Sequence, residues 1–189
     1  MAPEPHYEPG SIGFSHSKGL IGWAIRFGEY LRFRKGNFWN HAFIVSDRVD
    51  ENGKQLIIQA LGGGVNGSKP LSQVAPGGRY EIVPLPEGVA PEDVLNFAEA
   101  QIGSAYGWLS IASTAIRIIL PRWLPLPSIR SNSTWYCSAL AAESLRCGGW
   151  IYNWPDIYNV VPSSLYAALS GLTPKELKIL ETETSEYYG

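Results

Sequence analysis

The sequence predicts an α+β fold, in which helices pack against one small antiparallel β-sheet. Two apolar runs, at 42–46 and 55–61, flank a turn at 50–53. The Asn-Gly pair of this turn tolerates positive φ, which is typical of a β-hairpin. Elsewhere, apolar residues recur at helical spacing and the runs end at Pro or Gly, which indicates helices. These observations together favour a sheet with packed helices over an all-α or all-β domain.

The elements can be placed in order along the chain. Strands are expected at 11–14, 42–46, 55–61 and 80–85. Helices are expected at 20–34, 91–102, 109–120, 137–146 and 163–169, followed by a last short helix from 173. The three glycines at 62–64 are interpreted as the turn that ends the third strand.

Several helix boundaries follow from single residues. Pro91 suits the first turn of its helix, and Gly103 is a stop signal after it. Ser133 or Thr134 is expected to cap the helix that begins near Cys137. The Gly-Gly pair at 148–149 should end that helix.

The chain is expected to form a single domain. Its 189 residues suffice for one sizeable core, and no internal linker or repeat divides them. We expect an extended N-terminal arm at 1–10, one domain at 11–180 and a loose acidic tail at 181–189.

Composition indicates an ordinary globular protein. Hydrophobic residues make up 45% of the chain, charged residues 17%, and the net charge is −2, so nucleic acid is not an expected partner. The start of the chain lacks the features of a signal peptide, and no apolar run is long enough for a transmembrane helix. The expected location is therefore cytoplasmic or virion-associated.

The two cysteines, Cys137 and Cys147, are predicted to be reduced thiols. On one helix, ten residues separate them by about 15 Å, which is too far for a disulfide. No CxxC pair accompanies them and the chain has only three histidines, so a structural zinc site is not expected. Chemistry at a cysteine nucleophile would need neither a metal nor an organic cofactor, so none is expected.

Cys137 and His41 are the candidate catalytic residues. Cys137 lies at the first turn of its expected helix, where the helix dipole favours the thiolate. His41 begins an expected buried strand and could serve as the general base. Each also has a structural interpretation, as a small buried residue of the helix and as a histidine at a strand edge.

Two polar residues could complete such a site. Gln59 lies within the apolar strand 55–61, where its amide oxygen could orient the His41 ring, although it could also point into solvent. Tyr136 and the backbone N–H of Cys137 could stabilise an oxyanion, or Tyr136 could simply be a buried aromatic residue. Cys147, at the far end of the helix dipole, is interpreted as structural.

The order of these pieces resembles the circularly permuted papain-like superfamily, specifically its YiiX-type branch. That superfamily also holds NlpC-type endopeptidases and lecithin–retinol acyltransferases. The resemblance extends from about residue 11 to residue 169. It is carried by Ser11-Ile12-Gly13-Phe14, Phe38-Trp39-Asn40-His41-Ala42-Phe43-Ile44-Val45, Ile58-Gln59-Ala60 with Gly64-Val65, Tyr106-Gly107, Tyr136-Cys137-Ser138-Ala139-Leu140 with Gly148-Gly149, and Val161-Pro162-Ser163-Ser164-Leu165.

The resemblance implies a circularly permuted papain-like fold with a cysteine nucleophile at Cys137, a base at His41 and a third polar residue at Gln59. It adds Trp39 and Tyr106, with Tyr136, as residues of the oxyanion and substrate-binding region. The third position is commonly a carboxylate in this branch, and here it is an amide. A neutral amide orients the imidazole but stabilises the imidazolium less.

The function that follows is that of a thiol hydrolase, an amidase, peptidase or esterase, that works through a covalent acyl-enzyme. The family implies peptidoglycan-type peptides or lipid-like acyl groups as substrates. Two alternatives stay open. The first is an acyltransferase in which the apolar segment 109–126 forms a flap that touches a membrane, and the second is a non-catalytic binding or virion module that retains the fold.

Overall fold

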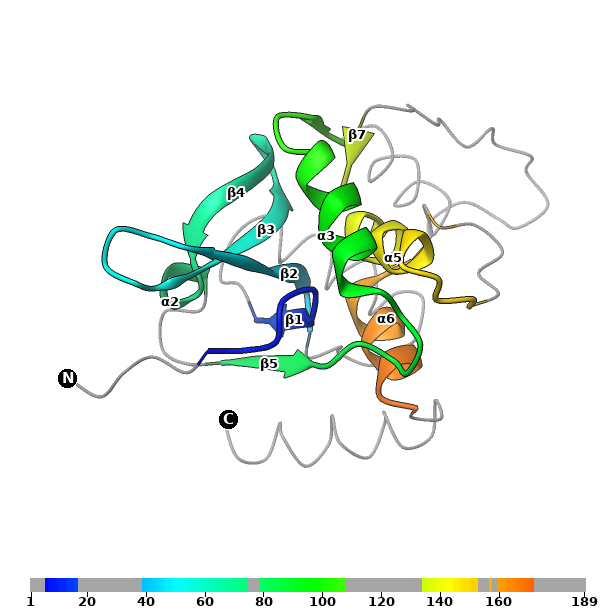
Figure 1. Ribbon diagram of the computed structural model, residues 1–189. Coiled ribbons are helices and arrows are strands. Elements are labelled where there is room, and N and C mark those ends of the chain that lie inside the picture. The colour runs from blue at the N-terminus through cyan, green and yellow to red at the C-terminus, as the bar shows by residue number, and fades with distance from the viewer. Residues whose placement is uncertain are drawn as a thin grey trace, which may run out of the picture.

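The computed structural model describes residues 6–16, 39–74, 79–107, 134–152, 157 and 160–171. Over these residues, a five-stranded sheet lies beside a group of helices (Figure 1). The α+β class expected from the sequence is confirmed. The helices expected at 20–34, at 109–120 and from 173, together with the tail at 181–189, lie outside the described residues.

The sheet is antiparallel between all neighbouring strands. Its strands in chain order are β1 (Ile12–Ser15), β2 (His41–Val49), β3 (Gln55–Leu61), β4 (Gly64–Pro70) and β5 (Tyr80–Val83). Their order across the sheet is β4-β3-β2-β1-β5. The strand that carries His41 is therefore central, with β3 on one side and β1 on the other.

The hairpin between β2 and β3 forms as predicted. A carboxylate oxygen of Asp50 accepts hydrogen bonds from the backbone N–H groups of Asn52 and Lys54, at 2.8 and 2.9 Å. Gly53 has φ of 73°, the left-handed conformation that the Asn-Gly pair allows. This turn fixes β3 against β2.

β4 is a strand that the sequence did not predict. The glycines at 62–64 do form a turn, but the chain then returns along β3, with Leu61 opposite Gly64. Glycine, Asn, Ser, Lys and Pro have low strand propensity, so the sequence of β4 looks like a loop. Its pairing comes from tertiary contacts instead, because the backbone of Val65 exchanges hydrogen bonds of 2.9 Å with Gly103 and Ser104.

The described helices are α2 (Leu71–Val74), α3 (Pro91–Ala100), α5 (Cys137–Cys147) and α6 (Pro162–Leu169). Three of them match expected helices, whereas the short α2 was not predicted. The N-cap of α5 is Tyr136, and no side chain caps it. The predicted cap at Ser133 or Thr134 is therefore wrong, because Thr134 belongs to a short strand, β7 (Thr134–Trp135), that leads directly into the helix.

β7 forms a parallel pair with β6 (Ala105–Tyr106), with Tyr106 opposite Trp135. The N–H of Gly107 also donates to the carbonyl of Trp135, at 3.0 Å. Two residues are too few for a recognisable strand pattern, so the sequence predicted neither strand. The pair joins the end of α3 to the start of α5.

The core divides into two parts, one on each face of the sheet. On one face, strand residues such as Phe14, Ala42 and Ile58 share a helix-side core with buried residues of α3, α5 and α6. The opposite-face core is smaller and consists of Phe43, Val45, Ile57 and Leu71. Ala42 lies in the helix-side core and its neighbour Phe43 in the opposite-face core, so successive β2 side chains point to alternate faces of the sheet.

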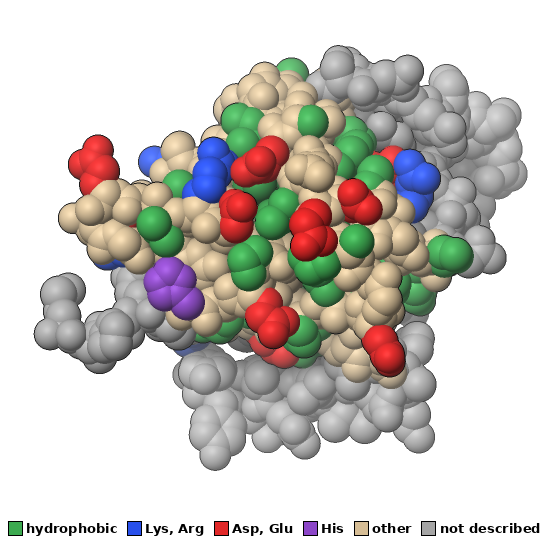
Figure 2. Space-filling model, in the orientation of Figure 1, with side chains coloured by type: hydrophobic (Ala, Val, Ile, Leu, Met, Phe, Trp, Pro, Cys, Tyr) green, Lys and Arg blue, Asp and Glu red, His purple; other side chains and the backbone are tan. Residues whose placement is uncertain are grey.

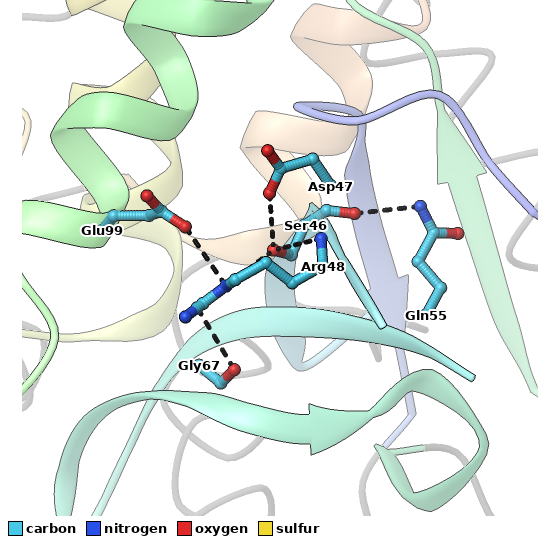
Figure 3. Close-up of polar contacts among 6 residues, drawn as sticks. All are labelled: Ser46, Asp47, Arg48, Gln55, Gly67 and Glu99. Atoms are coloured by element: carbon cyan, nitrogen blue, oxygen red, sulfur yellow. Dashed lines mark hydrogen bonds and ion pairs between the residues drawn. The ribbon is translucent and has the colours of Figure 1, made fainter. Parts of the chain in front are cut away.

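A polar network holds the far half of β2 in place (Figure 3). Arg48 lies within 3.3 Å of Glu99 on α3 and donates to the carbonyl of Gly67 on β4. On the other side, the buried amide of Gln55 donates to the carbonyl of Ser46, at 2.9 Å. These contacts tie β2, β3, β4 and α3 together at the end of the sheet remote from His41.

The outer surface is mixed in character. Acidic side chains stand among apolar ones on the face shown in Figure 2. The first turn of α3 carries two acidic residues, Glu92 and Asp93. Among the described residues, no helix has the length and apolar character needed to cross a membrane.

Candidate active site

The structure brings His41 and Gln59 together. His41 is the first residue of β2, and Gln59 lies near the end of the neighbouring strand β3. Their side chains form a hydrogen bond of 2.8 Å between Nε2 of the imidazole and Oε1 of the amide. Both residues are buried, at 5% and 3% exposure, so the solvent-facing interpretation of Gln59 is wrong.

This hydrogen bond determines which ring nitrogen of the neutral His41 carries the proton. An amide oxygen only accepts hydrogen bonds, so Nε2 carries the proton of the neutral imidazole. Nδ1 then holds the lone pair and is the basic nitrogen. Burial lowers the pKa of His41, an effect that the Gln59 hydrogen bond partly opposes. The ring is therefore neutral, and available as a base, to a lower pH than a histidine in water.

Cys137 occupies the first position of α5 and is 3% exposed. It is a free thiol, as expected. Its place in the first turn subjects it to the positive end of the helix dipole, which favours the thiolate.

A chain of contacts places the start of α5 at the same end of the sheet as His41. β3 ends and β4 begins at this end, where the antiparallel β2 starts. Val65 in β4 bonds to the backbone of Ser104, and Tyr106 just beyond it pairs with Trp135. Cys137 follows two residues later, and α5 packs against both β2 and β3.

Tyr106 lies close enough to Cys137 to sense its charge. The pKa of the Tyr106 phenol is raised well above its usual range, first by burial and then by the negative charge of a Cys137 thiolate. The phenol therefore keeps its proton and remains a potential hydrogen-bond donor beside the thiol.

The other two residues of the expected substrate region have structural contacts. The hydroxyl of Tyr136 donates to the carbonyl of Ile157, at 3.3 Å. The ring of Trp39 packs against Phe14 and Tyr166, with centroid distances of 6.4 and 5.7 Å, at the border of the helix-side core. Tyr136, the N-cap of α5, thus contacts the chain ahead of α6, whereas Trp39 packs against β1 and α6.

Cys147 contrasts with Cys137, although both lie on one helix. It is exposed at the last position of α5. Its pKa is raised by partial burial of the thiol and by the carboxylate of Glu143. The thiolate is therefore disfavoured at Cys147.

Two residues beside the His41–Gln59 pair were not singled out in the sequence. Ser15 lies opposite His41 in the register of β1 and β2, and Asn66 lies opposite Gln59 in the register of β3 and β4. Ser15 could have been found in the sequence as a polar residue at the end of a predicted strand. Asn66 could not, because β4 itself was not predicted.

Within the described part of the chain, no group of three or more His, Cys, Asp or Glu residues is arranged to hold a metal ion.

No model of a known protein family matches the sequence, and a search of curated proteins finds no similar sequence.

Proposed function

We propose that this protein is a thiol hydrolase that cleaves an amide or ester bond through a covalent acyl-enzyme. The observation that carries the proposal is the buried hydrogen bond of 2.8 Å between His41 and Gln59. A buried histidine whose ring is fixed by a side-chain amide has a defined tautomer and a defined basic nitrogen, which is what a general base requires. The start of α5, with a cysteine in its first turn, lies at the same end of the sheet.

The proposed reaction begins when Nδ1 of His41 takes the thiol proton of Cys137. Sγ then attacks the substrate carbonyl carbon, and the resulting oxyanion accepts a hydrogen bond from the backbone N–H of Cys137, with the Tyr106 phenol as a second candidate donor. The imidazolium returns its proton to the leaving amine or alcohol, which departs. Water next attacks the thioester while His41 takes a proton from it. The tetrahedral intermediate then expels Sγ, which regains this proton from the imidazolium, so the carboxylic acid leaves and the free thiol and neutral His41 are restored.

The amide of Gln59 determines how far the protonated form of His41 is stabilised. It orients the ring and favours the charged imidazole, but without the full charge of a carboxylate. The burial that lowers the pKa of His41 also disfavours a resting thiolate–imidazolium pair. We therefore propose that His41 acts mainly as a base during attack.

The papain-like resemblance supports two substrate classes, peptides of the peptidoglycan type and lipid-like acyl groups. The apolar segment 109–126, on which an acyltransferase would depend, lies outside the described residues. A hydrolase is the simpler proposal, because water is the only acceptor that the reaction then needs.

The test is the pH dependence of alkylation at Cys137, measured by mass spectrometry with a small uncharged reagent. We expect Cys137 to react well below pH ~8.5, the usual range of a free thiol. Cys147 is the internal reference and should react only at higher pH, because its pKa is raised. The His41→Ala variant should lose the low-pH reactivity of Cys137 and keep the behaviour of Cys147.

A Cys137 that titrates like an ordinary or buried thiol, regardless of His41, would contradict the proposal. The protein would then be better described as a non-catalytic binding module. If the dyad is present, amide, ester and peptidoglycan-fragment substrates can be screened with Cys137→Ser as the inactive control.

A further inference from the structure

The residues on either side of Cys137 are both bonded to the stretch of chain just ahead of α6. The Oγ atom of Ser138 donates a hydrogen bond of 2.6 Å to the carbonyl oxygen of Val160. The phenol of Tyr136 donates one of 3.3 Å to the carbonyl oxygen of Ile157. The two acceptor residues are themselves joined, because the N–H of Val160 donates to the carbonyl of Ile157 at 3.3 Å. We call the two side-chain hydrogen bonds the α5 clamp.

The α5 clamp is buried and rests on a fixed support. Ser138 and Val160 have no exposed surface, and Tyr136 is 9% exposed. Val160 is followed by Val161, the N-cap of α6. The backbone N–H of Val161 donates to Oγ of Ser164, which donates back to the carbonyl of Val161, at 3.1 and 2.9 Å. The clamp therefore ties the start of α5 to the capped start of α6.

The start of α5 lacks a side-chain cap of its own. Its N-cap residue, Tyr136, makes no capping hydrogen bond to the helix. The first turn of a helix is prone to fray, because its backbone N–H groups have no partners within the helix. Cys137 is the first residue of this turn. The hydrogen bonds of its two neighbours to the chain ahead of α6 offset the missing cap.

We propose that Ser138 and Tyr136 are positioning residues, which hold the first turn of α5 closed and thereby fix the thiol of Cys137. The inference rests on the proposed role of Cys137 as the nucleophile. A nucleophile must stay aligned with its base and with the substrate carbonyl, and a displacement of about 1 Å can cost about 10²-fold in rate. The helix dipole also favours the thiolate only while the first turn is formed.

The clamp also determines what the hydroxyl of Tyr136 can do. A phenol has a single O–H and donates one hydrogen bond. In the clamp, that hydrogen bond goes to the carbonyl of Ile157. Tyr136 therefore acts on the nucleophile by holding the helix start. The backbone N–H of Cys137 and the phenol of Tyr106 are left as the candidate donors to the oxyanion.

Ser144 provides a matched comparison on the same helix. Like Ser138, it has no exposed surface, and its Oγ atom also donates to a backbone carbonyl. The acceptor is the carbonyl of Leu140, at 2.9 Å, so this bond stays within α5 and reaches no other element. The Ser144→Ala variant therefore removes a buried serine hydroxyl from α5 without affecting the clamp.

The experiment is the pH profile of alkylation at Cys137 in the full chain, measured by mass spectrometry with a small uncharged reagent. Each profile gives the pH of its midpoint and the limiting rate at high pH. In Ser138→Ala, we expect the midpoint to rise by about 0.5 to 1 unit, because the thiolate loses the dipole of a fully formed first turn. The limiting rate should increase several-fold, because the thiol is only 3% exposed while the clamp is closed.

Three further variants separate the clamp from a general loosening of the helix. Tyr136→Phe removes only a hydroxyl, and it should shift both quantities in the same direction but by less, because its hydrogen bond is the longer one. Ser138→Thr keeps the hydroxyl and should retain the wild-type profile. Ser144→Ala should leave the midpoint and the limiting rate unchanged.

A wild-type midpoint and limiting rate in Ser138→Ala would overturn the clamp, as would an equal change in Ser144→Ala. If Ser138→Ala does not fold, Tyr136→Phe decides by the same criteria. The limiting rate reports the exposure of the thiol and does not depend on catalysis. A faster limiting rate in Ser138→Ala, combined with an ordinary thiol midpoint in the wild type, would keep the clamp and refute the proposed hydrolase. A low wild-type midpoint that no clamp variant changes would do the reverse.

Discussion

At the scale of single residues, the His41–Gln59 pair is the feature that a sequence pattern could suggest but not establish. A polar residue inside an apolar strand indicates that Gln59 needs a partner, and a neighbouring strand with a histidine offers one. That the partner is Nε2, at 2.8 Å, depends on the stagger of two strands and on side-chain rotamers. The assignment of Nδ1 as the basic nitrogen follows from that detail alone.

The Gln59→Glu substitution tests how far the charge of the third residue governs the base. His41 must be neutral to accept the thiol proton, so Cys137 should lose reactivity as the pH falls through the pKa of His41; this fall is the acid limb of the pH profile. Burial lowers that pKa, so in the wild type the acid limb should lie below pH ~6.5. A carboxylate at 59 would favour imidazolium and raise the pKa of His41. The acid limb should therefore move to higher pH by about one unit or more, measured by alkylation or turnover across pH.

The control for this substitution is Gln73→Glu, the same change at an exposed position of α2. It should leave the acid limb in place. An acid limb that is the same in Gln59→Glu and the wild type would mean that residue 59 does not contact the base in the working protein.

At the scale of elements, the sequence predicted those strands and helices whose boundaries are chemically marked. The hairpin with its Asn-Gly turn, α3 with Pro at its start and α6 all have such marks. β4, β6 and β7 have none, because their pairing depends on partners that are distant in sequence. The cap of α5 was mispredicted for the same reason, since parallel pairing with β6 keeps Thr134 extended.

The middle of β1 offers a test of how tightly the sheet elements fit. A Cβ atom on Gly13 would lie 2.0 Å from the ring of Phe43, on the neighbouring strand. We expect Gly13→Ala to lower the free energy of unfolding by about 1–3 kcal/mol, because the ring or the strand must move. Denaturant unfolding measures this change.

Gly63→Ala is the comparison at the element level, because a Cβ atom there meets nothing within 4 Å. It should be close to neutral. Adding Phe43→Leu to Gly13→Ala should recover part of the loss by removing the clashing ring. A Gly13→Ala protein as stable as the wild type would show that β1 and β2 pack less closely than the structure indicates.

At the scale of the whole molecule, the helix-side core makes the sheet and α5 one structural unit. Leu140 and Leu145 of α5 are buried in the same cluster as Ile44 and Ile58 from the centre of the sheet. The position of Cys137 relative to His41 is therefore set by packing along the whole helix. A change deep in the core should affect the candidate site and the fold together.

Leu140→Ala tests this coupling. Leu140 is 1% exposed, so its truncation should lower the free energy of unfolding by about 2–5 kcal/mol. Because one core joins both elements, helix and sheet should unfold in a single transition, and far-UV circular dichroism and tryptophan fluorescence should give the same midpoint. Val49→Ala, at a residue that is 50% exposed, should change stability little.

If α5 melted first in Leu140→Ala, with the sheet intact, the helix and the sheet would unfold as separate units. The cysteine at the start of α5 would then lack the fixed geometry that a nucleophile paired with His41 requires.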